Sequence, residues 1–212
     1  MELCTRGSLI DVITNDHSLP LYRKLILGRH IAAGMRRIHE HQMIHRDIRP
    51  ANILVDDEYI AKIGDMGIAR VLDPRGCHTQ IGCLQYMPPE FYQGSINQKL
   101  DIFTYGLTLY HLFTGYYHEY DSRNHRIHLN LTLPVLGDIV SRCCQSAANQ
   151  RPSAFELERT LMLYERGFLE LVVNKQSSYE NMNKNQQDRL FVEFCHSFRP
   201  HAAQFARRNG FL

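Results

Sequence analysis

Two short strings in the first third of the chain contain residue types that could carry out chemistry. The first string is His45-Arg46-Asp47-Ile48-Arg49-Pro50-Ala51-Asn52, and the second is Gly64-Asp65-Met66-Gly67. Phosphoryl transfer needs such residues, because the transferred group spreads negative charge over its oxygens and the protein must hold metal ions and orient a hydroxyl. The 18 residues from Asp47 to Asp65 allow two short strands to return the second carboxylate beside the first. Taken alone, Asp47 would be interpreted as a carboxylate on a surface loop.

Taken together, the two strings resemble the motifs of protein kinases. The first matches H-R-D-x-x-x-x-N, the kinase catalytic loop, and the second lies where the metal-binding Asp-Phe-Gly motif occurs in that family. The stretches KIGDMGIAR and KLDIFTYGLTLYHLFTG are similar to the tyrosine-kinase-like and leucine-rich-repeat kinase groups. The resemblance covers residues 1 to about 165. It implies the C-terminal lobe of a kinase, a mainly α fold in which a short two-stranded hairpin accompanies the catalytic loop.

The resemblance implies chemical roles for four residues. Asp47 would accept or orient the proton of the substrate hydroxyl. Asn52 and Asp65 would hold Mg²⁺, a hard cation that takes oxygen ligands. Arg49 stands where serine/threonine kinases usually have a lysine near the transferred phosphate, so the charge is kept but its geometry changes. Some cytoplasmic tyrosine kinases also have arginine here, and this position therefore leaves the substrate class open.

The first residues resemble the hinge of a kinase, which contacts ATP. Backbone groups of Glu2 and Cys4 would face the adenine, Ser8 and Asp11 would approach the ribose, and Leu54 would pack beneath the purine. Ser8 and Asp11 have an equally good interpretation as the cap of a helix that starts after them.

Three structural roles follow from the same resemblance. Glu90 in GCLQYMPPE would form a buried ion pair with Arg151 in NQRPS and tie this segment to the last helices. Asp101 would anchor the catalytic loop from a buried helix. Met66 replaces the phenylalanine of the Asp-Phe-Gly motif and would still pack under His45.

Regulation is expected at the segment between the second string and Glu90. In the family, an arginine placed like Arg46 usually contacts a phosphate on this segment. The only hydroxyls there belong to Thr79 and Tyr86. Tyr86 should be committed to the substrate loop, so Thr79 is the predicted phosphorylation site. Cys83 replaces a threonine that commonly bonds the catalytic residues, and its thiol is a weaker donor than a hydroxyl.

The hydrophobic pattern predicts the elements that position these residues. Helical spacing favours a helix over about 20–39, and dense apolar residues over 102–113 predict a helix buried nearly all round. LGDIVSRCC and SAFELERTLMLYERGF are typical of two more helices, the latter with a capping box from Ser153 and Glu156. NILV and YIAKI are typical of short strands. Residues 72–94 are expected to form a long exposed loop, and the polar stretch 174–189 a linker.

Composition excludes several classes of protein. The chain has 212 residues, 44% of them hydrophobic, which is enough for a sizeable core and argues against disorder. A net charge of +2 gives no reason to expect a nucleic acid or an anionic membrane as partner. The apolar runs are too short to span a bilayer. The 6 cysteines include no C-x-x-C pair, so we expect reduced thiols and a cytoplasmic location.

The sequence motifs that mark the N-terminal half of a kinase are missing. No two of the 13 glycines are separated by a single residue, which excludes the glycine-rich G-x-G-x-x-G loop. The single lysine before the catalytic loop, Lys24, lies within the first long helix, and neither Glu2 nor Glu40 is placed to pair with it. We therefore expect the N-terminal β lobe to be absent, a kinase unit over residues 1–168 and a polar linker with a C-terminal extension over 169–212.

Two hypotheses remain. The first is a protein kinase, serine/threonine rather than tyrosine, that uses ATP and Mg²⁺ on a protein substrate. The second is a catalytically inactive, kinase-derived binding or scaffold module. Retention of Asp47, Asn52 and Asp65 favours the enzyme, whereas the missing lobe favours the module. In either case a separate N-lobe or partner protein is expected to cover the surface around Leu54.

Overall fold

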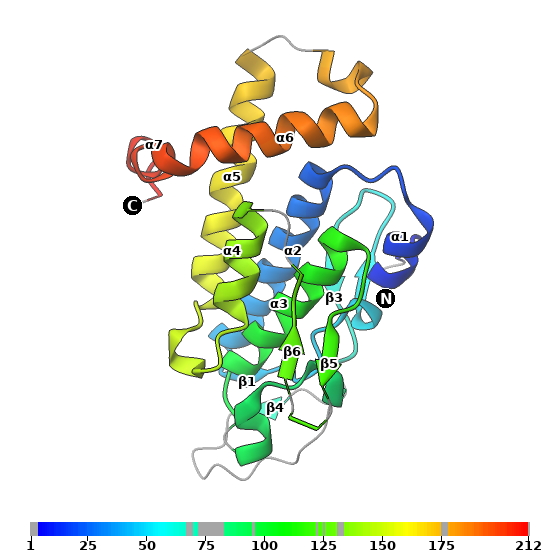
Figure 1. Cartoon of the computed structure of the whole chain (residues 1–212), viewed down its shortest axis with the longest axis vertical. Helices are drawn as coiled ribbons and strands as arrows, with labels where there is room; N and C mark the ends of the chain where they lie inside the picture. Colours follow the sequence, from blue (N-terminus) through cyan, green and yellow to red (C-terminus); the bar gives the residue numbers. More distant parts are fainter. Residues whose placement is uncertain are drawn as a thin grey trace.

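Helices dominate the structure, a computed structural model that describes residues 4–66, 70–71, 83–94, 96–121, 123–124, 126–130, 134–174 and 178–211. They surround three long helices, α2 (Leu21–Glu40), α3 (Lys99–Thr114) and α5 (Ala154–Asn174) (Figure 1). Strands in this part of the chain form two-stranded pairs only. The predicted mainly α fold is therefore confirmed, and the described residues contain no larger sheet of the kind that an N-terminal β lobe would supply.

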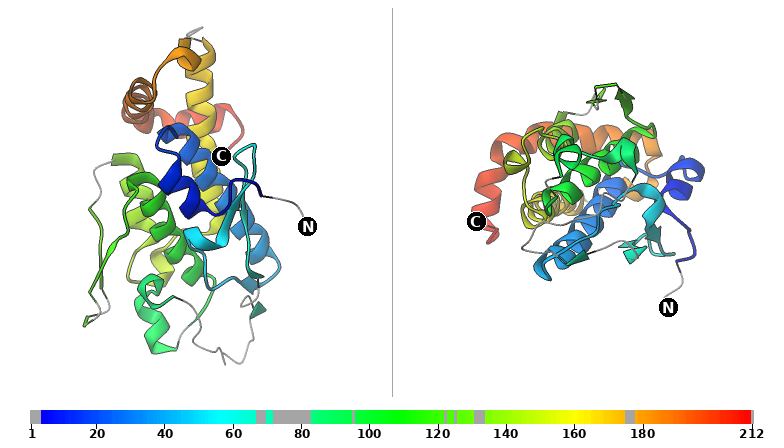
Figure 2. Two further views of the ribbon diagram at one scale, coloured as in Figure 1. Left: turned by 90° about the vertical axis from the view of Figure 1, so that its right-hand side faces the viewer. Right: turned by 90° about the horizontal axis from the view of Figure 1, so that it is seen from below.

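Helices α2 and α5 pack side by side along most of their length (Figures 1 and 2). The predicted 20–39 helix is α2, and its buried face includes Leu27, Ile31 and Met35. An ion pair between Arg36 Nε and Glu158 Oε2, 2.7 Å apart, joins the two helices at their partly exposed edge. Helix α2 also packs on strands β1 (Met43–Ile44) and β3 (Ala61–Ile63), which lie on either side of the first motif in the sequence.

Helix α3 is the buried centre of the fold. Every residue from Leu100 to Phe113 is buried, as its apolar sequence predicts. The Tyr105 hydroxyl donates to the Gly28 carbonyl of α2 at 2.9 Å. The Thr108 hydroxyl donates to the Ile48 carbonyl at 3.0 Å, so α3 also contacts the segment with the first motif.

Two predicted strands form the hairpin that connects the two motifs. Strand β2 (Ile53–Val55) pairs antiparallel with β3 (Ala61–Ile63), which confirms the strands expected at NILV and YIAKI. Strand β1 (Met43–Ile44) pairs with β4 (Arg70–Val71), and β5 (Glu119–Asp121) pairs with β6 (Arg126–His128). The β2–β3 hairpin packs on α1 (Leu9–Asn15) and α2.

His30 makes the contact between α2 and β3 sensitive to acid. Its Nδ1 accepts a hydrogen bond from the Ala61 backbone nitrogen at 3.4 Å. Burial, reinforced by the charge of Arg29, lowers the pKa of His30 to about 4. The unfolded chain, with a histidine pKa near 6.5, binds the proton first, so the free energy of unfolding falls as pH decreases from about 6.5 to about 4.

We expect His30 to account for on the order of 1 kcal/mol of this loss, because the side chain is only half-buried and solvent screens its charge. In urea unfolding at a series of pH values, the variant His30→Gln should show a correspondingly shallower decline. His196→Gln, which alters an exposed histidine, should keep the original decline. An unaltered pH dependence in His30→Gln would contradict the assignment.

The prediction of a long exposed loop over 72–94 is wrong for the last part of this segment. Residues 72–82 lie outside the described residues. From Leu84 to Tyr86 and from Pro89 to Gln93 the chain forms two short 3₁₀ helices, η3 and η4. Tyr86, Met87 and Phe91 are buried, and they pack in one apolar cluster with residues of α3. Proline and glycine content indicated a loop, but these apolar side chains hold the segment against the core.

The C-terminal part is more ordered than its polar composition predicted. Helix α4 (Pro134–Cys143) precedes η5 (Ala148–Gln150) and α5, as expected. The predicted linker over 174–189 is wrong from its middle onward, since η6 (Ser178–Asn181) is followed by α6 (Lys184–Phe198), η7 (Arg199–His201) and α7 (Ala202–Arg208). The predicted division after residue 168 falls within α5, which continues to Asn174.

Aromatic packing and a helix cap explain this order. Asn183 and Gln186 form a capping box at the start of α6. Phe191 and Phe194 then pack edge-on against Phe168 of α5, with ring centroids 5.1 and 5.3 Å away. A Cβ at Gly167 would lie 2.8 Å from the ring of Phe198, so glycine permits the close crossing of α5 and α6 (Figure 1).

The capping box predicted for α5 is present. The Ser153 hydroxyl accepts from the Glu156 backbone nitrogen at 3.2 Å, and the Glu156 carboxylate accepts from the Ser153 backbone nitrogen at 2.7 Å. Ser153→Ala should lower the free energy of unfolding by about 1 kcal/mol, measured in urea. The control Ser141→Ala removes an exposed hydroxyl inside α4 and should have little effect. Equal losses in the two variants would contradict a specific capping role.

Candidate active site

Asp101 of α3 anchors the first motif. Its Oδ2 accepts from the His45 backbone nitrogen at 2.9 Å, and its Oδ1 accepts from the Arg46 backbone nitrogen at 2.8 Å. The side chain of Asp101 is fully buried. Arg46 has a φ of +74°, a conformation that L residues rarely adopt, and the bond from its amide to Asp101 holds it there. Asp101 thus holds the backbone of the first motif through two hydrogen bonds from a buried helix.

His39 contacts the same carboxylate, a role that sequence analysis does not predict. Its Nε2 lies 2.9 Å from Asp101 Oδ2. His39 lies in the last turn of α2 and precedes the first motif in the sequence. A histidine near a helix end is a common surface feature, so only the fold reveals this contact.

The Asp47 carboxylate is held from one side. Its Oδ2 accepts from Arg49 Nε at 3.0 Å and from Asn52 Nδ2 at 2.6 Å. Asn52 Nδ2 also donates to the Asp47 carbonyl at 2.9 Å. The other oxygen, Oδ1, is buried and makes no hydrogen bond to any described residue. The bond from Arg49 to Asp47 raises the pKa of the guanidinium further. One carboxylate oxygen is thus held by two donors, and the other has no donor among the described residues.

Gly64 links the second motif to the first. The His45 Nε2 donates to the Gly64 carbonyl at 2.9 Å, and the Gly64 nitrogen donates to the Asn52 carbonyl at 2.8 Å. The next residue, Asp65, is exposed and has a φ of +51°, a second backbone conformation unfavourable for a non-glycine residue. The two motifs therefore meet, as their spacing predicts. Met66 was expected to pack under His45, but its side chain is 43% exposed.

The residues expected near ATP lie along β2. The Arg6 nitrogen donates to the Val55 carbonyl at 3.1 Å, and the Val55 nitrogen donates to the Gly7 carbonyl at 2.9 Å. Cys4 is half-buried, Leu54 is 40% exposed, and Glu2 lies outside the described residues.

Ser8 and Asp11 form a capping box at the start of α1, which confirms the cap interpretation. The Asp11 carboxylate accepts from the Ser8 hydroxyl at 2.6 Å and from the Ser8 backbone nitrogen at 2.7 Å. These two bonds lower the pKa of Asp11. The cap does not test a contact with ribose, and that role stays a prediction.

Tyr86 of η3 is buried. Its hydroxyl makes no hydrogen bond within the described residues, and burial raises its pKa. Tyr86 shares a buried apolar cluster with Ile44, the residue just before the first motif. Cys83, three residues earlier, is half-buried. Thr79 lies outside the described residues.

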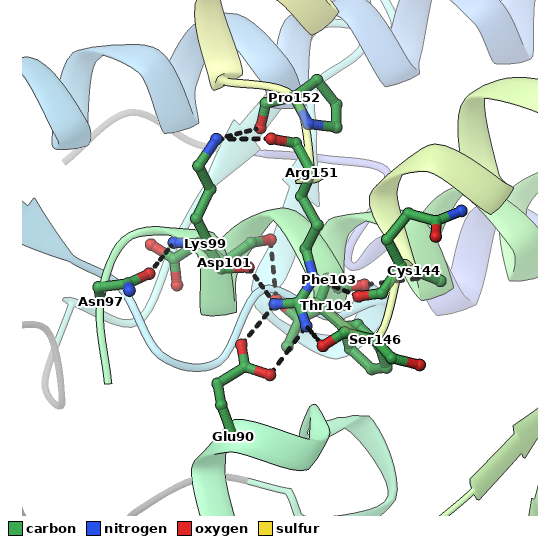
Figure 3. A network of polar contacts seen from close by, with 11 residues as sticks. Glu90, Asn97, Lys99, Asp101, Phe103, Thr104, Cys144, Ser146, Arg151 and Pro152 are labelled. Carbon is green, nitrogen blue, oxygen red and sulfur yellow. Dashed lines mark hydrogen bonds and ion pairs between the residues drawn. The ribbon is translucent and has the colours of Figure 1, made fainter. Parts of the chain in front are cut away.

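The predicted ion pair between Glu90 and Arg151 is present (Figure 3). Arg151 Nη1 lies 2.5 Å from Glu90 Oε1, and Nη2 donates to Oε2 at 2.8 Å. The guanidinium also donates to the carbonyls of Gln145 and Lys99 at 2.7 and 2.9 Å. The Arg151 side chain has no exposed surface. This network fastens η4 to the start of α3 and to the segment before α5.

Comparisons with known proteins agree with this geometry. The family model described as the protein kinase domain matches residues 1–162. A probable serine/threonine-protein kinase of Dictyostelium discoideum is 30% identical over 178 residues, which are 76% of this chain and 17% of that protein.

Two plant proteins are also similar. Serine/threonine-protein kinase STY17 of Arabidopsis thaliana is 32% identical over 117 residues, covering 54% of this chain and 20% of that protein. Chitin elicitor receptor kinase 1 of Physcomitrium patens is 40% identical over 88 residues, covering 40% of this chain and 14% of that protein. The chain thus spans a fifth or less of the length of these relatives. None of the helices in the described part of the chain has the length and apolarity needed to cross a bilayer.

Proposed function

The chain belongs to the protein kinase family, and we propose that it provides the catalytic loop for transfer of the ATP γ-phosphate to a serine or threonine hydroxyl of a protein. The observation that carries this proposal is the Asp47 carboxylate, with Oδ2 held by Arg49 and Asn52 and with Oδ1 buried and unpartnered among the described residues. The printed names of the Dictyostelium and Arabidopsis relatives favour serine/threonine over tyrosine as substrate.

Asp47 acts as the base in this proposal. Its fixed Oδ2 sets the orientation of the carboxylate, and Oδ1 accepts the proton of the substrate hydroxyl. Arg49 keeps one guanidinium edge on Asp47 and places positive charge beside the position of the transferred group. An acceptor within hydrogen-bond distance of the hydroxyl is the geometric requirement for such a base.

Asn52 and Asp65 are the proposed ligands of Mg²⁺. Asn52 uses only Nδ2 in its bonds to Asp47, which leaves its amide oxygen for a cation. Within the described residues, no three or more His, Cys, Asp or Glu side chains are grouped to hold a metal ion by themselves. Two protein oxygens fit Mg²⁺ nevertheless, because this ion commonly takes one or two protein ligands together with waters and substrate phosphates. Bound Mg²⁺ would neutralise charge on the ATP phosphates.

The ATP base and ribose are assigned to the start of the chain and β2. Leu54 offers an exposed apolar side chain for the purine, and Glu2 and Cys4 offer backbone groups for the adenine. Ser8 and Asp11 are proposed to lie near the ribose in addition to capping α1. Phosphate on Thr79 is the proposed regulatory signal, with Arg46 as its contact.

The alternative function, a kinase-derived binding module without catalysis, has one observation in its favour. Leu54 of β2, Ile60 just before β3 and Met66 of the second motif are 40, 37 and 43% exposed. Large apolar side chains gathered on a surface indicate a binding partner. Under the enzyme hypothesis an N-terminal β lobe or a partner protein covers them. The free cysteines among the described residues support a reducing compartment, and we propose the cytoplasm.

Phosphate transfer from ATP to a generic protein substrate, by the longest native form and its Asp47→Ala variant, tests the proposed function. The enzyme hypothesis predicts transfer that the substitution abolishes. Equal transfer by both forms would contradict it. Binding of partner proteins without any transfer would favour the module.

A further inference from the structure

A cavity of about 650 Å³ lies at the C-terminal end of α3, beside the β5–β6 hairpin. Its described lining includes three tyrosines, one carboxylate and no lysine or arginine. Tyr110 lies in the last turns of α3, Tyr116 and Tyr117 follow the helix, and Glu119 and His128 face each other as a registered pair of the hairpin. Figure 2 shows the hairpin at the outer edge of the molecule.

The turn after α3 fixes the tyrosines in place. Gly115 has a φ of +77° and ends the helix in the left-handed conformation that glycine favours. The Thr114 hydroxyl donates to the Tyr110 carbonyl at 2.7 Å and accepts from the Tyr116 nitrogen at 3.1 Å. The ring of Tyr117 packs on that of His111, with centroids 4.1 Å apart. Tyr116 and Tyr117 nevertheless remain 75 and 56% exposed, which is unusual for side chains of this size.

The electrostatics of this cavity favour a cation. The face of a tyrosine ring attracts an ammonium or guanidinium group. The carboxylate of Glu119 is exposed and forms no ion pair with a described residue. The C-terminus of α3, a helix of 16 residues, adds the negative end of its dipole. We propose that the cavity binds an arginine or lysine side chain of the protein substrate.

The cavity lies next to η3 and η4, and this position points to the protein substrate as the source of the side chain. His118, between Tyr117 and Glu119, donates from Nε2 to the Gln85 carbonyl at 2.7 Å. Its ring packs edge-on against Tyr86, with centroids 5.0 Å apart, and Tyr86 shares a buried cluster with Ile44, the residue just before the first motif. The Tyr92 and Tyr120 hydroxyls form a second link, 3.0 Å long. A polypeptide whose hydroxyl reaches Asp47 therefore continues towards the cavity; this assignment rests on the proposed function.

A binding experiment tests the cavity independently of catalysis. The probes are fluorescein-labelled serine peptides on a glycine-alanine scaffold, with arginine at one of several scanned positions or with citrulline, its neutral analogue. At 150 mM salt and without ATP, we expect at least one arginine peptide to bind the chain about tenfold more tightly than its citrulline partner. Equal anisotropy titrations for every arginine and citrulline pair would overturn the proposal.

Four variants localise the effect. Tyr116→Leu and Glu119→Gln should each weaken binding of the arginine peptide about three- to fivefold, while Tyr116→Phe retains the ring and should bind like the wild type. Glu180→Gln, at an exposed glutamate of η6, controls for net charge and should have no effect. Equal binding by Tyr116→Leu and the wild type would overturn the site.

Phosphorylation by the longest native form tests the link to the substrate. The arginine peptide should be phosphorylated with a higher kcat/KM than the citrulline peptide, and Glu119→Gln should remove the difference. Identical kcat/KM values, with binding still dependent on Glu119, would contradict the substrate assignment. Absence of transfer to either peptide and to generic protein substrates would contradict the proposed function and leave the binding result intact.

Discussion

Replacing Asp47 with asparagine is expected to lower kcat for phosphate transfer by about 10²- to 10⁴-fold, the usual contribution of a positioned general base. Asparagine has nearly the same size and can still accept the Asn52 amide hydrogen bond, so the loop should keep its shape. It cannot accept the proton of the substrate hydroxyl. The measurement is steady-state kinetics of the longest native form with a generic serine/threonine substrate.

The KM for ATP separates this effect from general damage. If Asp47 acts on the proton in the transition state, KM for ATP should stay within about twofold of the wild-type value. Asp57→Asn, which changes an exposed aspartate in the turn between β2 and β3, is the matched control and should keep full activity. A loss of similar size in both variants, or a kcat unchanged by Asp47→Asn, would contradict the role assigned to Asp47.

Replacing Arg151 with methionine is expected to lower the free energy of unfolding by about 3–5 kcal/mol, the range for breaking a buried ion pair from one side. The substitution leaves the Glu90 carboxylate, which is only 12% exposed, without its partner. It also removes the donors of the Gln145 and Lys99 carbonyls. Urea unfolding of the 212-residue chain measures the change.

A double variant distinguishes the stranded carboxylate from the lost packing. Adding Glu90→Gln to Arg151→Met removes the uncompensated charge, so part of the lost stability should return. The coupling between the two positions then follows from the double-mutant cycle. A loss below about 1 kcal/mol in Arg151→Met would place this ion pair with weak surface pairs and contradict its structural role.

Long periodic segments made much of the fold predictable. Helices α2 and α3 and the strands β2 and β3 lie where apolar spacing places them, because a strong hydrophobic pattern specifies both the element and its buried face. Helix α6 was missed because Asn, Gln and Lys dominate its first turns. The capping box of Asn183 and Gln186 was the local signal for this helix. Its stabilising contacts come from packing of Phe168 of α5 against Phe194 of α6, and of Phe194 against Phe198.

The residues of the candidate site that belong to the two sequence motifs could be predicted from the sequence. Asp101, Glu90 and Arg151 lie far apart in the sequence, and the resemblance to kinases, rather than spacing, suggested their contacts with the loop and with each other. The shared use of Asp101 by His39 depends on where α2 ends against α3, which no local pattern encodes. The tyrosine cavity likewise depends on the packing of the β5–β6 hairpin against the end of α3.

The central claim, that this chain carries the catalytic loop of a serine/threonine kinase, is tested most directly by phosphoamino acid analysis. The longest native form is incubated with Mg²⁺, γ-labelled ATP and a generic protein substrate, and the labelled residues are identified after hydrolysis. The account predicts labelled phosphoserine or phosphothreonine that is absent when Asp47 is replaced with alanine. Labelled phosphotyrosine alone, or labelling that persists without the Asp47 carboxylate, would contradict it.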